Sequence, residues 1–177
     1  MGLDSGFLTV AQIVWKNVSS PLSRARESAE IVADRLVYEK EDIVVEALLR
    51  ERYFGRGEGL TIEERTKKYP NDNYPEMESL EELITRAQSV FEKIVMSFHD
   101  KNNILLVAHG AILYAILTAI TDGQIPYGGK TVKFDSGSIH VIKYLDGAIE
   151  LAKYGKEEAA FFKGRPSGYP MGGDSCV

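Results

Sequence analysis

The stretch at residues 104–111, which reads ILLVAHGA, decides the fold. It opens with an unbroken apolar run of the kind found in strands inside parallel sheets. His109 and Gly110 interrupt the run before a second apolar stretch, which predicts a buried strand that turns directly into a buried helix. The apolar region as a whole, 104–120, is at the short end of the roughly 20 residues that a membrane-spanning helix requires. We therefore expect no membrane association.

Strand and helix patterns alternate along the chain on both sides of this stretch. Two capping boxes, Thr61 with Glu64 and Ser79 with Glu82, indicate helix starts, and Asp146-Gly147 is a strong hairpin signal. We expect an α/β domain whose mostly parallel sheet is flanked by helices on both faces. The expected elements are a strand at 13–18, a helix at 21–38 capped by Ser20, a strand at 43–49, helices that start after Thr61 and Ser79, a strand at 104–108, a helix at 111–121, and a hairpin of 137–145 with 148–154.

Composition narrows the class of protein. The chain has 177 residues, a formal charge of −5 and a pI near 5.3, which fit a single globular domain and do not favour a nucleic-acid partner. A single cysteine, Cys176, and the lack of a signal peptide lead us to expect a cytoplasmic protein. We expect one domain over 1–163 and a flexible tail over 164–177, which is rich in glycine and proline.

The three histidines and the cysteine lie far apart in the sequence and do not form a metal-binding pattern. A nucleotide-binding glycine motif is also missing, so we expect neither a metal nor a cofactor. His99 lies at an expected helix end and His140 in an expected strand, and we interpret both as structural.

Three residues are candidates for chemistry on phosphate. Arg24 lies in the first turns of an expected helix, where backbone N–H groups and a guanidinium suit phosphate oxygens. His109 ends a strand at the position where open α/β sheets bind ligands. Glu51 follows an apolar strand and is a candidate general acid. Taken one at a time, they are more simply a surface arginine, a structural histidine and a solvated loop carboxylate.

Three motifs, taken together, change this balance. SSPLSRA at 19–25, ERYFGRGEG at 51–59 and LLVAHGA at 105–111 resemble, in this order, the signatures of the histidine phosphatase superfamily, which has a phosphoglycerate-mutase-like fold. The resemblance covers about residues 14–154. The chain is similar to the broad-specificity bacterial phosphatase branch rather than to the glycolytic mutases, because the region between its second and third motifs is too short for the mutases' cap insertions.

The resemblance implies a phosphomonoester hydrolase that acts on a phosphorylated small molecule. It places Arg24, His109 and Gly110 at the phosphoryl group, where His109 stabilises the charge in transfer. It makes Glu51 the proton donor to the leaving-group oxygen. The candidate specificity loops, 69–77 and 123–131, carry no readable code for the rest of the substrate.

The family's nucleophile is the histidine of an Arg-His-Gly motif near the N-terminus, and no histidine of this sequence follows an arginine. Residues 2–9 resemble the loop after that motif, so we expect the first strand and most of the first helix to be missing. The pocket would then bind phosphate with impaired turnover, and an unpaired sheet edge would favour self-association. The alternatives are a non-catalytic phospho-ligand-binding or regulatory module, an active phosphatase with a misassigned start, and an unrelated α/β domain.

Overall fold

The computed structural model describes residues 16–98, 103–130, 132–145, 148–154 and 159–164. The chain forms two compact units, Met1–Ile112 and Leu113–Val177. The expected features at 2–9, His99, the Asp146-Gly147 turn, Cys176 and the tail from 165 onward lie outside the described residues.

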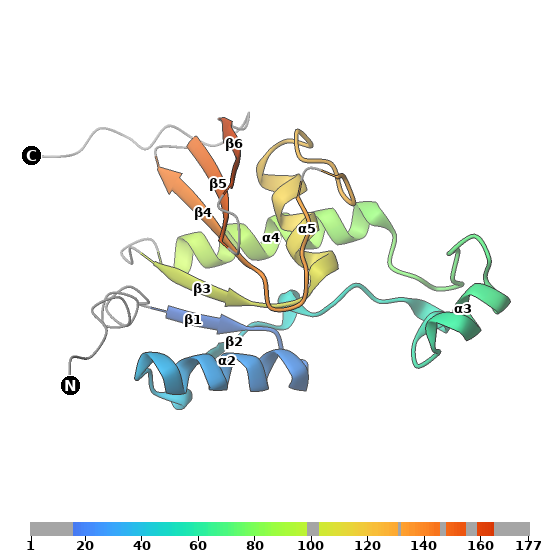
Figure 1. Cartoon of the computed structure of the whole chain (residues 1–177), viewed down its shortest axis with the longest axis horizontal. Helices are drawn as coiled ribbons and strands as arrows, with labels where there is room; N and C mark the ends of the chain where they lie inside the picture. Colours follow the sequence, from blue (N-terminus) through green and yellow to red (C-terminus); the bar gives the residue numbers. More distant parts are fainter. Residues whose placement is uncertain (1–15, 99–102, 131, 146–147, 155–158, 165–177) are drawn as a thin grey trace, which may run out of the picture. The chain divides into compact units, whose positions relative to one another are not determined.

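The first unit is built on a parallel sheet with the strand order β2-β1-β3. In β1 (Lys16–Ser19) and β3 (Ile104–Val107), Lys16 pairs with Ile104 and Ser19 with Val107, so the two strands end side by side. Helix α2 (Ser23–Leu36) lies on one side of the sheet and α4 (Leu80–Ser97) on the other (Figure 1). The expected α/β fold, with a parallel sheet flanked by helices, is confirmed.

Helix α2 presents three alanines, Ala25, Ala29 and Ala33, as its buried face. Small side chains at helical spacing let the helix backbone approach the sheet closely. The predicted start at residue 21 was wrong, because Leu22 keeps an extended backbone and the helix begins at Ser23.

Strand β2 (Val44–Val45) is much shorter than the predicted strand at 43–49, which was therefore wrong in length. The carboxylate of Glu46 accepts a hydrogen bond from the backbone N–H of Leu48 at 3.0 Å and caps the 3-10 turn η2 (Ala47–Leu49). Glu46 also pairs with Lys93 of α4 at 2.6 Å. This local side-chain bond competes with strand pairing and ends β2 early.

Both predicted capping boxes are present, and they fix where α3 (Ile62–Lys68) and α4 begin. In each box the cap hydroxyl accepts from the backbone N–H three residues on at 3.2 Å, and the glutamate accepts from the cap N–H at 2.8 Å. The buried face of α4 is apolar except for one charged side chain, Arg86. Its other buried residues are Leu83, Ala87, Val90, Phe91 and Ile94.

Strand β3 is half-buried along its whole length, although its apolar sequence predicted a buried strand. The reason is visible in its pairing: among the residues that the structure describes, β1 is its only strand neighbour. The helix after it, α5 (Gly110–Ile120), is buried as predicted, with Ile112, Ile116 and Ile120 at most 1% exposed.

The second unit contains an antiparallel sheet in the order β4-β5-β6. Strands β4 (Ile139–Leu145) and β5 (Ala148–Tyr154) form the predicted hairpin, whereas β6 (Ala159–Gly164) was not predicted. His140 stacks on Phe134 with ring centroids 4.2 Å apart, and its Nε2 lies 3.0 Å from the Oγ of Ser138. These contacts agree with a structural role for His140.

Candidate active site

The site begins where β1 and β3 end beside each other. The chain leaves β1 through Ser20, whose backbone N–H donates to the carbonyl of Val107 at 2.9 Å, and it leaves β3 through Ala108 and His109. The carboxyl ends of parallel strands are where α/β sheets place ligands. The register of these two strands therefore brings together two polar side chains that are 89 positions apart in sequence.

Ser20 and His109 are joined by a buried hydrogen bond. The Nε2 of His109 lies 2.8 Å from the Oγ of Ser20, and the two residues are 8% and 0% exposed, respectively. The backbone N–H of Leu22 also donates to this Oγ, at 3.3 Å. A hydroxyl can accept one bond and donate another, so Ser20 can donate to the ring nitrogen. Sequence reasoning treated Ser20 only as a helix cap and missed this contact.

The surroundings of His109 favour its neutral form. Burial, and then the positive charge of Arg24, lower the pKa of His109 from 6.5 to about 4. At neutral pH the imidazole is therefore an uncharged hydrogen-bonding group. An anion bound beside Arg24 would oppose the effect of that charge and raise the proton affinity of the ring.

Arg24 lies in the first turn of α2, and this turn carries no acidic residue. Its side chain is exposed, and its guanidinium makes no hydrogen bond or ion pair with any residue that the structure describes. An arginine in this position keeps all five N–H donors available, and these match phosphate oxygens in pairs. The structure places Arg24 close enough to His109 for its charge to act on the ring.

Glu51 and Arg24 line the same hollow, which has a volume of about 1190 Å³. This is enough room for a phosphoryl group together with the organic part of a substrate. Glu51 is half-buried, and its Oε1 accepts from the backbone N–H of Arg52 at 2.9 Å. Arg24 and Glu51 thus line the same hollow, and the charge of Arg24 acts on His109. No hydrogen bond joins Glu51 to His109.

A buried ion pair fixes the segment that carries Glu51, although residues 51–54 are neither helix nor strand. Both Nε and Nη2 of Arg86 donate to the carboxylate of Glu78 at 2.8 Å, with side chains only 7% and 10% exposed. Nη1 of Arg86 donates to the carbonyls of Leu48 at 2.6 Å and Arg50 at 2.9 Å. The backbone just before Glu51 is therefore held from α4.

Glu78 holds the same segment after Glu51. Its carboxylate accepts from the N–H of Tyr53 at 3.1 Å, and its own N–H donates to the carbonyl of Tyr53 at 2.9 Å. The Nε of Arg52 donates to the carbonyl of Glu78 at 2.9 Å. The sequence signal that could have revealed this arrangement is a charged residue, Arg86, inside the apolar stripe of α4.

The remaining motif residues have structural explanations. Gly55 has a φ of +52°, and a Cβ there would lie 2.1 Å from the carbonyl oxygen of Pro75, so only glycine fits. The carboxylate of Glu58 accepts from the N–H of Phe54 at 2.9 Å, as a structural residue would. Gly110 opens α5 directly after His109, and a Cβ there would meet nothing within 4 Å.

Within the described ranges, no three His, Cys, Asp or Glu side chains are grouped so that they could hold a metal ion. No helix in those ranges is both long and apolar enough to cross a membrane.

The groups that lie together at the ends of β1 and β3 are a hydroxyl, a neutral imidazole and an arginine, which form an arrangement suited to an anion.

Comparisons with known proteins point the same way. The family model described as histidine phosphatase superfamily (branch 1) matches residues 8–157. The uncharacterized phosphatase PhoE of Bacillus subtilis (strain 168) is 42% identical over 110 residues, which cover 60% of this chain and 53% of PhoE. The chain spans about half the length of the curated relatives that it matches.

Solved structures resemble the chain in fold. Bacillus stearothermophilus YhfR superposes with a TM-score of 0.66 at 22% identity, covering 77% of this chain and 71% of YhfR. A mycobacterial glucosyl-3-phosphoglycerate phosphatase, solved with inorganic phosphate, gives a TM-score of 0.59 at 18% identity over 91% of this chain and 81% of its own. At such identities the likeness concerns the fold alone.

Proposed function

The chain belongs to the histidine phosphatase superfamily (branch 1), and from that membership we propose that it binds the phosphoryl group of a phosphomonoester between Arg24 and His109. The observation that carries the proposal is the buried hydrogen bond between Ser20 and His109, next to an arginine with no partner among the described residues. These groups offer donors to phosphate oxygens without any competing carboxylate in the first turn of α2.

Each residue has a distinct role in this proposal. Arg24 donates hydrogen bonds to two phosphoryl oxygens. His109, oriented by Ser20, donates to a third oxygen, either as a neutral ring or as a ring that takes up a proton because the phosphate is negatively charged. Gly110 leaves open space at the start of α5 for the ligand. Glu51 donates a proton to the oxygen that leaves when the P–O bond breaks, so that the alcohol departs neutral. The net reaction converts a phosphomonoester and water into an alcohol and phosphate.

Turnover is the part of the proposal that we expect to be weak in this 177-residue chain. The family reaction passes through a phosphohistidine, and no histidine of the sequence lies in an Arg-His-Gly motif. In this proposal His109, whose Nε2 is hydrogen-bonded to Ser20, serves as a stabilising group rather than as the nucleophile. We therefore propose binding of phosphate with hydrolysis lowered by several orders of magnitude.

The same observation supports a second candidate, a non-catalytic module that binds phosphorylated ligands. The name of the relative PhoE and the phosphate in the mycobacterial phosphatase support phosphorylated ligands for this fold, although they describe those proteins.

The single cysteine supports a reducing, cytoplasmic setting. We also propose self-association through β3, since β1 is its only strand neighbour among the described residues.

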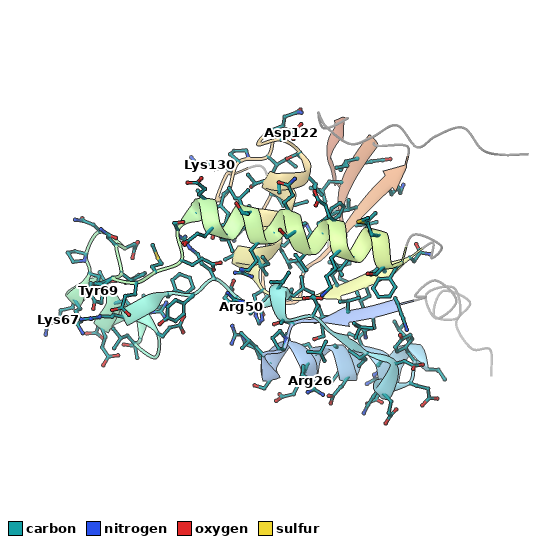
Figure 2. The ribbon with its side chains drawn as sticks, turned by 180° about the vertical axis from the view of Figure 1, so that it is seen from behind. Arg26, Arg50, Lys67, Tyr69, Asp122 and Lys130 are labelled. Carbon is teal, nitrogen blue, oxygen red and sulfur yellow. The ribbon has the colours of Figure 1, made fainter. Side chains whose placement is uncertain are left out.

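The test combines binding with hydrolysis. Purified protein is titrated with inorganic phosphate by calorimetry and assayed with p-nitrophenyl phosphate, alongside Arg24→Gln and His109→Ala. Arg26→Gln is the matched control. Arg26 lies two residues further along α2 (Figure 2), and its Nη2 is 3.7 Å from the carboxylate of Glu30. We expect phosphate binding that the first two variants weaken by at least about tenfold and the control does not.

Two outcomes would change the conclusion. Rapid hydrolysis that both site variants abolish would show an active phosphatase and overturn the expectation of weak turnover. A folded protein that does not bind phosphate would overturn the phosphate pocket itself.

A further inference from the structure

We propose that Ser20 is a positioning residue whose hydroxyl decides which ring nitrogen of His109 carries the proton. Because this hydroxyl donates to Nε2, the ring keeps its own proton on Nδ1, and Nδ1 meets the phosphoryl group as a hydrogen-bond donor. The inference rests on the phosphate pocket proposed above. It deepens that proposal, since a neutral imidazole has only one N–H to offer and its position decides what the ligand meets.

The hydrogen bonds of the Ser20 side chain determine where its own hydrogen lies. The backbone N–H of Leu22 is 3.3 Å from Oγ, and a backbone N–H can only donate, so Oγ is the acceptor in this bond. The other partner of Oγ is Nε2 of His109 at 2.8 Å. No further hydrogen bond joins this hydroxyl to a residue that the structure describes. The hydroxyl hydrogen therefore belongs to the bond with Nε2.

Burial makes the opposite arrangement costly. If Nε2 carried the ring proton and donated to Oγ, the hydrogen of Ser20 would have no acceptor among the described residues. Ser20 is fully buried, so it has no exposed surface at which solvent could supply an acceptor. A buried donor without an acceptor is unfavourable. The neutral ring therefore accepts at Nε2 and carries its proton on Nδ1.

Nδ1 of His109 is available to a ligand. The two nitrogens of an imidazole point in different directions, so the bond at Nε2 does not occupy Nδ1. Nδ1 makes no hydrogen bond with any residue in the described ranges, and it is not among the atoms there that are both enclosed and without a partner. A ligand can therefore reach it. The charge of Arg24 acts on the same ring, so the two donors can serve one anion.

The position of the proton matters because the ring is uncharged at neutral pH. Burial and the charge of Arg24 lower the pKa of His109 to about 4. With its proton on Nδ1, the neutral ring offers an N–H to a phosphoryl oxygen. With its proton on Nε2, it would turn a lone pair towards that oxygen and repel it. Ser20 thus makes His109 a donor to phosphate without a second proton from solvent.

The first part of the experiment examines the free protein and needs no ligand. Two-bond 1H–15N NMR spectra at neutral pH distinguish a protonated ring nitrogen from a bare one, and His109→Gln identifies the signals of this ring by their loss. We expect the wild-type ring to carry its proton on Nδ1. Ser20→Ala should lose this preference, because Nε2 no longer has a donor. Ser20→Thr keeps the hydroxyl and should retain it.

Ser19→Ala is the matched control. Ser19 is as fully buried as Ser20, but its Oγ donates to the carbonyl of Ser20 at 3.1 Å and not to the ring. The position of the ring proton should be the same in this variant as in the wild type. This readout distinguishes a positioning role from a structural one, because a general loss of stability does not move a proton from one ring nitrogen to the other.

The second part measures binding of inorganic phosphate by calorimetry. Ser20→Ala should bind about tenfold more weakly than the wild type, because the ring no longer presents Nδ1–H reliably. Ser20→Thr and Ser19→Ala should bind within about twofold of the wild type. Circular dichroism shows whether each variant is folded.

The outcomes separate the two proposals. If the folded wild type binds no phosphate, the phosphate pocket is wrong, and the role of Ser20 in it falls as well. If phosphate binds but the free ring carries its proton on Nε2, or Ser20→Ala keeps either the proton position or the affinity, the role of Ser20 is overturned and the phosphate pocket stands. The wild-type spectrum decides the proton position even if Ser20→Ala does not fold.

Discussion

The imidazole of His109 is the residue whose chemistry depends most on what the pocket holds. Burial and the charge of Arg24 lower its pKa to about 4, while its Nε2 is bonded to the buried hydroxyl of Ser20. A phosphate dianion next to Arg24 would reverse the electrostatic effect. Ligand binding should therefore be linked to uptake of a proton at this ring.

The first prediction follows from this linkage. In NMR titrations of the ring protons, the midpoint for His109 should lie near pH 4 without ligand and should rise when phosphate is added. His109→Gln identifies the resonance by its loss. A midpoint near 6.5 in the free protein, or one that phosphate leaves unchanged, would contradict both the burial of the ring and the position of the phosphate.

The same shift has a consequence for stability. Below pH 6.5 the unfolded chain gains a proton at His109 that the folded chain takes up only near pH 4, so this residue's contribution falls as the pH drops between these values. A shift of this size corresponds to a loss of up to roughly 3 kcal/mol. In His109→Gln this part of the pH dependence should disappear from urea unfolding curves.

At the scale of the elements, the Glu78–Arg86 pair holds a segment that has no regular structure of its own. Replacing Arg86 by methionine leaves the Glu78 carboxylate buried without its partner, and this should lower the free energy of unfolding by about 3–5 kcal/mol. Lys93→Met on the same helix is the matched control. Its partner Glu46 is buried, but Lys93 itself is 59% exposed, so the loss should be about 1 kcal/mol or less.

Urea denaturation followed by circular dichroism measures both variants. Equal losses in the two would show that the Glu78–Arg86 pair does not hold the Glu51 segment. Phosphate affinity, measured on the same samples where they remain folded, should fall in Arg86→Met and stay unchanged in Lys93→Met.

Local signals were sufficient to predict some elements and not others. The starts of α3 and α4 could be predicted because each capping box lies within four residues of sequence. The length of β2 could not be predicted in this way. It depends on a hydrogen bond that the N–H of Leu48 donates to the carboxylate of Glu46, and this bond only forms when the chain leaves the strand. A serine followed by proline looks like a helix cap, and nothing near Ser20 in the sequence shows that its partner is His109.

The site residues divide in the same way. The motifs led to Arg24, Glu51 and His109. In the structure Arg24 lines the same hollow as Glu51, and its charge acts on His109. Their roles in binding and proton transfer remain predictions. Ser20 and Arg86 were missed, because their importance lies in long-range contacts, which cannot be read from spacing.

At the scale of the whole molecule, the half-buried strand β3 leads to a prediction about assembly. It is apolar along Ile104–Val107, and β1 is its only strand neighbour in the described ranges. We expect reversible, concentration-dependent self-association in analytical ultracentrifugation, because an apolar strand with one strand neighbour in the described ranges can pair with a second copy.

Leu105→Lys should weaken this association, since a lysine on an edge strand opposes pairing. The control is Val45→Lys on β2, which is the other outer strand of this sheet but is two residues long. Circular dichroism shows whether each variant is folded. A wild-type protein that stays monomeric at all concentrations and melts at a high temperature would contradict the proposal.

The hydrogen bond between Ser20 and His109 also has a consequence for how the chain folds. It closes a loop of 89 positions, so the groups that would hold phosphate meet only after β1 has found β3. Contacts of such long sequence separation are slow to form. Phosphate would then select chains that have completed this step and protect them from unfolding by mass action. During refolding, the recovery of phosphate affinity should report the late pairing of β1 with β3 rather than the earlier formation of the helices.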